Sequence, residues 1–173
     1  MNGVDPWGML PEIVETLERS YGLLKTAILD LRQCLREREK SKTKVAVLKL
    51  RGHVGEVDAV LSRLRAKMQM AVARNDTTGF KMHRDEIARI YGLVVNAGNE
   101  LMDTISECQS YLNGYPKLRD ALYLKLETEH VMEDEPEIYQ DLTKFTWWVN
   151  YSSDATRKAL EMLNKHLKSE YET

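Results

Sequence analysis

The clearest pattern in the chain is a repeat of apolar residues between about residues 43 and 74. Eight of them follow one another at alternating spacings of three and four residues, so all eight share one side of a helix. They are Val47, Leu50, Val54, Val57, Leu61, Leu64, Met68 and Ala71. The pattern predicts a long helix over residues 43–74 that packs through one apolar edge, which we call the packing seam.

A second long helix is predicted over residues 78–112, after the turn-forming residues Asn75–Gly79. Its apolar residues recur at helical spacing and include Phe80, Ile87, Tyr91, Val94, Leu101, Ile105, Cys108 and Leu112. Because a short turn between two long helices favours antiparallel packing, we expect these two helices to form a hairpin with the packing seam inside it.

Further helices are predicted on both sides of this hairpin. They cover residues 10–38, 116–131, 136–150 and 154–169. Pro11 suits the first turn of one helix, Pro136 restarts the chain after an acidic break, and Ser152-Ser153-Asp154 is expected to cap the last helix. No alternating pattern of β-branched residues indicates a strand. The sequence therefore predicts an all-α fold, an elongated antiparallel helical bundle.

The composition fits a single helical domain over residues 1–173. Charged residues make up 30% and hydrophobic residues 43% of the chain, with only four prolines and nine glycines, as amphipathic helices require. No apolar run reaches the ~18 residues of a membrane span, and residues 1–11 lack the plan of a signal peptide. We expect a cytoplasmic protein, with peripheral membrane contact left open. Within the domain we expect a tail, the long helices and three shorter C-terminal helices, at residues 1–9, 10–112 and 116–170.

The charges are distributed unevenly along the chain. Residues 1–40 carry 6 Lys/Arg and 7 Asp/Glu, residues 41–95 carry 11 and 5, and residues 96–173 carry 8 and 15, so the nets of −1, +6 and −7 sum to −2.

Seven cations of the basic segment are candidates for contact with an anionic surface. They are Lys42, Lys44, Lys49, Arg51, Arg63, Arg65 and Lys67. The alternative is an ordinary solvated face. Nucleic acid is less favoured than anionic lipid, because no aromatic residue interleaves with these charges between residues 41 and 79.

Two groups of titratable residues invite a chemical interpretation. Glu127 and His130 have the Glu-x-x-His spacing of di-iron bundles, but such sites need two of these pairs and the chain has one. His83-Arg84-Asp85-Glu86 has no nucleophile beside it in sequence. We therefore predict no catalytic residue, no metal ligand and no cofactor.

The cysteines and the paired tryptophans lie on apolar positions of the predicted helices. We expect Cys34 and Cys108 to be small buried residues rather than a disulfide or metal pair. Trp147 and Trp148 are expected either to pack in the core or to contact a partner, because indole suits interfaces.

Part of the chain resembles the ESCRT-III core, in particular its archaeal cell-division branch. The resemblance lies within residues 50–112 and is carried by Leu50–Lys67, Ala71–Asp76 and Asp85–Ile90, which pair a leucine- and arginine-bearing helix with an acidic turn and a Glu-Ile-Ala segment. It implies a membrane-bound polymer that uses a basic first hairpin helix, an acidic C-terminal part that holds the monomer closed, and recycling by an AAA ATPase. The long helix 10–38 departs from that family's plan.

Three functional hypotheses follow from the sequence. The first is a non-catalytic helical bundle that acts through protein–protein interaction or self-assembly, with a protein partner or a homo-oligomer. The second is an ESCRT-III-like, membrane-associated polymerising subunit. The third is a helical enzyme or metal-binding bundle.

Overall fold

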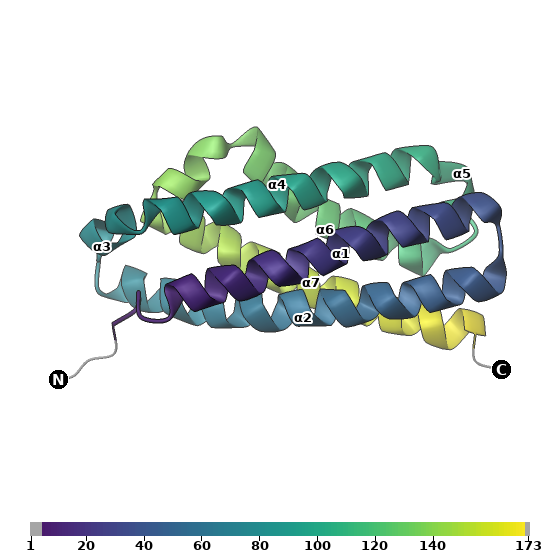
Figure 1. The fold of residues 1–173 in the computed structure, drawn as a ribbon, viewed down its shortest axis with the longest axis horizontal. Helices are drawn as coiled ribbons and strands as arrows, with labels where there is room; N and C mark the ends of the chain where they lie inside the picture. Colours follow the sequence, from purple (N-terminus) through teal and green to yellow (C-terminus); the bar gives the residue numbers. More distant parts are fainter. Residues whose placement is uncertain (1–4, 172–173) are drawn as a thin grey trace.

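The computed structural model describes residues 5–171, and its regular elements over that range are all helical. The long helices are α1 (Leu10–Glu37), α2 (Lys40–Ala73), α4 (Arg84–Glu107), α6 (Pro116–Asp134) and α7 (Leu142–Tyr171). Short elements connect them, namely α3 (Thr77–Met82), α5 (Gln109–Leu112) and the 3-10 helix η1 (Pro136–Gln140). The predicted all-α bundle is confirmed (Figure 1).

The long helices form a closed ring around one core. In the described residues, each helix packs against the next in the order α1, α2, α7, α6 and α4, and α4 packs back against α1. Figure 1 shows α4 along one side of α1 and α2 along the other. The inward sides contribute to one continuous apolar cluster that extends from Trp7 to Leu167. The ring order places α2 and α7 together on one side of the bundle and α4 and α6 on the other.

The packing seam of α2 is buried over its whole length, as predicted. All eight of its residues, from Val47 to Ala71, are at most 3% exposed. The buried side is wider than a two-position seam, because Ala46 and Val60 are buried beside it. A wide apolar side can be covered by two neighbouring helices, and in this structure those neighbours are α1 and α7.

The predicted hairpin between residues 43–74 and 78–112 is wrong in its packing. Within residues 5–171, the extensive interfaces do not include a pair of α2 with α4. The tight antiparallel pair is α1 with α2, joined through Arg38 and Glu39 alone. Arg38 adopts the left-handed conformation (φ 56°) and its N–H donates to the Leu35 carbonyl, which closes the turn. This connection is shorter than the one that separates α2 from α4, so α1 takes the place beside the seam.

Two other helix predictions need correction. The helix expected over residues 78–112 is interrupted at His83 and Cys108, so it becomes α3, α4 and α5. The helices expected over 136–150 and 154–169 are instead η1 followed by one continuous helix, α7. Asp141 provides the true N-terminal cap, since its Oδ1 accepts a hydrogen bond from the Lys144 N–H at 2.9 Å.

The serines expected to cap the last helix lie inside α7. Ser152 and Ser153 are fully buried, so packing of α7 against α2 and α6 overrides their local preference for a helix start. With 30 residues, α7 is longer than α1, which has 28. The expectation that residues 116–170 form only shorter helices is therefore wrong for this helix.

Candidate binding face on helix α2

The predicted cations of α2 fall into two rows, because most of them are seven or fourteen residues apart, with Glu56 and Asp58 at the intervening positions. Lys44, Arg51 and Arg65 form the first row, which faces α7 and is called the α7-side row. Arg51 Nη1 lies 3.3 Å from Asn164 Oδ1 and Arg65 Nη1 lies 2.9 Å from Asp154 Oδ1. These side chains are therefore drawn toward the neighbouring helix.

The second row lies on the other side of α2, beside α1. It contains Lys42, Lys49, Arg63 and Lys67 and is called the α1-side row. Lys42 is held by Glu37 and Glu39, each 3.4 Å away, and these carboxylates raise the pKa of Lys42. Within residues 5–171, none of the other three cations of this row has an ion pair. Their charge is therefore available to a partner.

Shallow hollows run along the α1-side row. One has a volume of about 510 Å³ and is lined by Lys42, Lys49 and Cys34 among others. Another of about 470 Å³ is lined by Arg63, Ala59 and Leu23 among others. Both are grooves between α1 and α2, and each is lined by apolar and charged side chains that a partner can contact.

Between the two rows, α2 presents an open apolar strip. Val45, Gly52, Ala59 and Ala66 are seven residues apart and, with Leu48 and Gly55, form what we call the outer ridge. Val45 is 51% exposed and Leu48 is 38% exposed. A Cβ built at Gly52 or at Gly55 would meet no atom within 4 Å. The ridge therefore leaves room for the backbone or side chains of another molecule to approach closely.

The two predicted tryptophans have different environments. Trp148 is fully buried, and its Nε1 donates to the Thr128 carbonyl at 2.9 Å, so of its two expected places it takes the core and not a partner contact. Trp147 is 53% exposed and stacks on Tyr151, with ring centroids 5.4 Å apart. Trp147 therefore keeps its place as a candidate contact residue.

The core contains a buried ion pair that the sequence reading did not identify. Lys125 is 3% exposed and Glu129 is 0% exposed, and Lys125 Nζ lies 2.8 Å from Glu129 Oε1. The ammonium also donates to Thr156 Oγ1 at 2.9 Å and to the Tyr21 hydroxyl at 3.4 Å. Burial and the neighbouring Glu129 raise the pKa of Tyr21 well above its ordinary value.

This ion pair is built as part of the core rather than as a substrate site. The three N–H groups of the Lys125 ammonium match its three acceptors, Glu129, Thr156 and Tyr21. The void beside Lys125 measures about 10 Å³, no larger than one water needs. A signal for the pair was present, because Leu118, Leu122, Lys125, Glu129 and Met132 follow the same four-three spacing as a packing seam.

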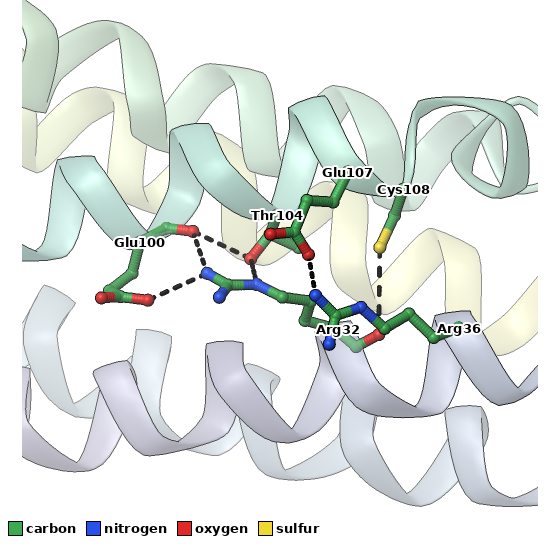
Figure 2. Close-up of polar contacts among 6 residues, drawn as sticks. All are labelled: Arg32, Arg36, Glu100, Thr104, Glu107 and Cys108. Atoms are coloured by element: carbon green, nitrogen blue, oxygen red, sulfur yellow. Dashed lines mark hydrogen bonds and ion pairs between the residues drawn. The ribbon is translucent and has the colours of Figure 1, made fainter.

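Polar contacts also connect α1 with α4 (Figure 2). The Arg32 guanidinium donates to the carbonyl and the carboxylate of Glu100, each at 2.9 Å, and to Thr104 Oγ1 at 3.0 Å. Arg36 pairs with Glu107, and the Cys108 thiol points at the Arg32 carbonyl. Burial raises the pKa of the Cys108 thiol. Cys108 is buried as predicted, whereas Cys34 is only half-buried and both are free thiols.

The other residues considered for chemistry do not converge on one point. Glu127 accepts a hydrogen bond from the Tyr151 hydroxyl. Partial burial, and to a smaller extent the neighbouring Glu127, raises the pKa of Tyr151 to about 12. His130 Nε2 lies 3.1 Å from Asp134 Oδ2, and His83 stacks on Trp7 at 5.2 Å. Among the described residues, no group of three or more His, Cys, Asp or Glu side chains could hold a metal ion.

No protein-family model matches this chain, and comparisons with curated proteins and with solved structures give no match either. In residues 5–171, no helix combines the length and apolarity that crossing a lipid bilayer requires.

Proposed function

We propose that this chain is a non-catalytic helical bundle that works by binding a protein partner, and that the outer face of α2 is its binding face. The observation that carries the proposal is the outer ridge of α2, an exposed apolar strip flanked by two rows of cations. Apolar area supplies affinity, while flanking charges select the partner and speed association.

The chemistry of this face defines the partner it suits. Helix α2 carries eight Lys/Arg and two Asp/Glu, a net of +6. The ridge is narrow and includes two open glycines, so an extended or helical segment can lie along it. A partner segment with apolar residues on one side and Asp or Glu on its flanks would satisfy both the ridge and the rows.

Selection from a random peptide display library tests this proposal. The full chain should enrich peptides that combine acidic residues with aliphatic or aromatic ones. The triple variant Lys49→Gln/Arg63→Gln/Lys67→Gln, which neutralises the α1-side row, should bind the selected peptides at least about tenfold more weakly.

A matched control separates the face from net charge. The variant Lys25→Gln/Lys81→Gln/Lys117→Gln also removes three cations, all outside α2, and should bind these peptides like the unmodified chain. Equal binding by both triple variants, or no enrichment at all, would refute the binding face.

A second candidate is peripheral contact with an anionic membrane, in the manner of an ESCRT-III-like polymerising subunit. The specific support is that the cations of both rows lie on one elongated helix that is open to solvent along its ridge. The pairing of α2 with α1 and α7 differs from the hairpin that the resemblance implies. Co-sedimentation with phosphatidylserine vesicles tests this candidate, and recovery that is equal with uncharged phosphatidylcholine vesicles would rule it out.

A further inference from the structure

We infer that the partner of the α2 face is a second copy of this chain, which docks through the exposed aromatic and acidic surface of α6 and α7. This inference rests on the proposed function of the α2 face and names its occupant. It follows from the way charge is divided across the ring of helices and from a second exposed surface with complementary chemistry.

The two sides of the bundle carry opposite charge of equal size. Helix α2 has a net of +6, and α7, with five Lys/Arg and three Asp/Glu, has a net of +2, which together give +8. Residues 84–141, which contain α4, α6 and η1, have five Lys/Arg and thirteen Asp/Glu, a net of −8. Since α2 packs with α7 and α4 packs with α6, the basic and acidic helices occupy different sides of the ring (Figure 1).

Exposed aromatic residues lie on α6 and on α7, where the acidic and basic sides of the ring meet. Tyr123 is 44% exposed and Trp147 is 53% exposed. Trp147 stacks on Tyr151, and Tyr151 hydrogen-bonds to Glu127. We call Tyr123, Glu127, Trp147 and Tyr151 the α6–α7 patch. Further exposed carboxylates lie along α6, at Asp120, Glu133 and Asp134.

The α6–α7 patch complements the α2 face in chemical character and in charge. Tryptophan and tyrosine are the residues that most often supply binding energy at interfaces. The open positions at Gly52 and Gly55 offer space for a large ring, and Lys49, Arg63 and Lys67 of the α1-side row can pair with the carboxylates or lie over the rings. Two like copies of the α2 face would instead bring positive rows together, which disfavours a symmetric contact through that face.

The inferred contact is head-to-tail, with the α2 face of one copy against the α6–α7 patch of the next. Each copy that binds through its α2 face leaves its α6–α7 patch free for the next copy. Contacts of this type produce closed rings or open filaments rather than a two-fold dimer. Because charge contributes to the contact, assembly should weaken as salt increases.

Sedimentation velocity of the full chain over a range of protein concentrations tests this inference. The unmodified chain should form species larger than the monomer, and these should dissociate between about 0.05 and about 0.5 M NaCl. The α2-face variant Lys49→Gln/Arg63→Gln/Lys67→Gln and the patch variant Glu127→Gln/Trp147→Ser should each sediment as monomers. Far-UV circular dichroism of each variant confirms that the bundle is intact.

An equal mixture of the two variants gives the decisive result. The α2-face variant retains its patch and the patch variant retains its α2 face, so the mixture should form a one-to-one dimer and nothing larger. The control Lys25→Gln/Lys81→Gln/Lys117→Gln should assemble like the unmodified chain.

A monomeric wild-type chain at every concentration in low salt would overturn the inference, as would a mixture that stays monomeric. If the peptide selection described above succeeds while the chain remains monomeric, the α2 face binds a different acidic partner and only the self-association is wrong. If both experiments fail, the proposed function fails with the inference.

Discussion

Lys125 of α6 and Lys49 of α2 have opposite environments. Lys125 on α6 is buried among a carboxylate and two hydroxyls, and each of its N–H groups has an acceptor. Lys49 on α2 is exposed at the edge of the outer ridge, with no ion pair within the described chain. The difference separates two uses of charge in one bundle. In the core, charge fixes how α1, α6 and α7 fit together, and on α2 it is available to a partner.

The largest expected effect comes from breaking the buried pair. Glu129→Gln leaves the Lys125 ammonium buried without its carboxylate, so unfolding should become easier by about 3–5 kcal/mol. The double variant Lys125→Met/Glu129→Leu removes both charges and should recover most of that loss. Urea denaturation followed by circular dichroism measures both, and a Glu129→Gln variant as stable as the unmodified chain would show that the pair contributes nothing.

The next effect concerns two glycines of α4 that differ in the space around them. A Cβ at Gly98 would lie 2.8 Å from the Cβ of Glu129, whereas a Cβ at Gly92 would meet nothing within 4 Å. Gly98→Ala should therefore destabilise the bundle by about 1–3 kcal/mol through overpacking. Gly92→Ala should stabilise it by up to about 1 kcal/mol through helix propensity. If urea denaturation shows that both variants change the free energy of unfolding in the same direction, this account is contradicted.

A smaller effect is expected at acid pH from the contact that holds Trp7. Trp7 Nε1 donates to Asp76 Oδ2 at 2.6 Å, and the Gly79 N–H donates to Asp76 Oδ1. Trp7 first and Gly79 second lower the pKa of Asp76 below its ordinary 3.8. Because the pKa of Asp76 is lower in the folded chain than in the unfolded chain, the ionised carboxylate stabilises the fold fully at pH values above the ordinary pKa. This stabilisation is lost as the pH falls through the lowered pKa of the folded chain. The melting temperatures of the unmodified chain and Asp76→Asn should therefore converge as the pH falls below about 4. A difference between the unmodified chain and Asp76→Asn that does not change with pH would disprove the contact.

The smallest effect on stability should come from the cations of α2. Exposed charges contribute little to folding, so Lys49→Gln/Arg63→Gln/Lys67→Gln should change the free energy of unfolding by no more than about 0.5 kcal/mol. Arg65→Gln, which loses the pair with Asp154, should behave similarly. A loss of several kcal/mol in urea denaturation would mean that this row supports the fold, and the contrast with Lys125 would disappear.

The sequence was sufficient for the helical fold class and the buried seam, but not for all of the helix boundaries or for the packing partners of the helices. The spacing from Val47 to Ala71 correctly predicts a buried seam, because a helix must cover a long apolar side. It does not say which helix covers the seam, since α1 and α4 both offer apolar stripes of similar length. The difference was set by turn geometry at Arg38, whose left-handed backbone brings α1 back beside α2.

The candidate site shows the same division. The cations of α2 were identified from composition, but their separation into two rows depends on which residues face α1 and α7. The outer ridge was missed because Gly52, Ala59 and Ala66 give no hydrophobic signal in a sequence. The sequence also could not distinguish the buried Trp148 from the exposed Trp147. The two residues are adjacent, so a small error in the predicted orientation of the helix exchanges their environments.

The most direct test of the binding face fills the outer ridge without changing any charge. Gly52→Gln/Gly55→Gln puts two side chains into open space on α2, and Gly22→Gln/Gly92→Gln does the same on α1 and α4. The dissociation constant of a selected acidic peptide is then measured by fluorescence anisotropy for both variants. We predict that binding weakens at least about tenfold for the α2 variant and stays unchanged for the control. Equal affinity of the two variants would contradict the assignment of the outer ridge as the binding surface.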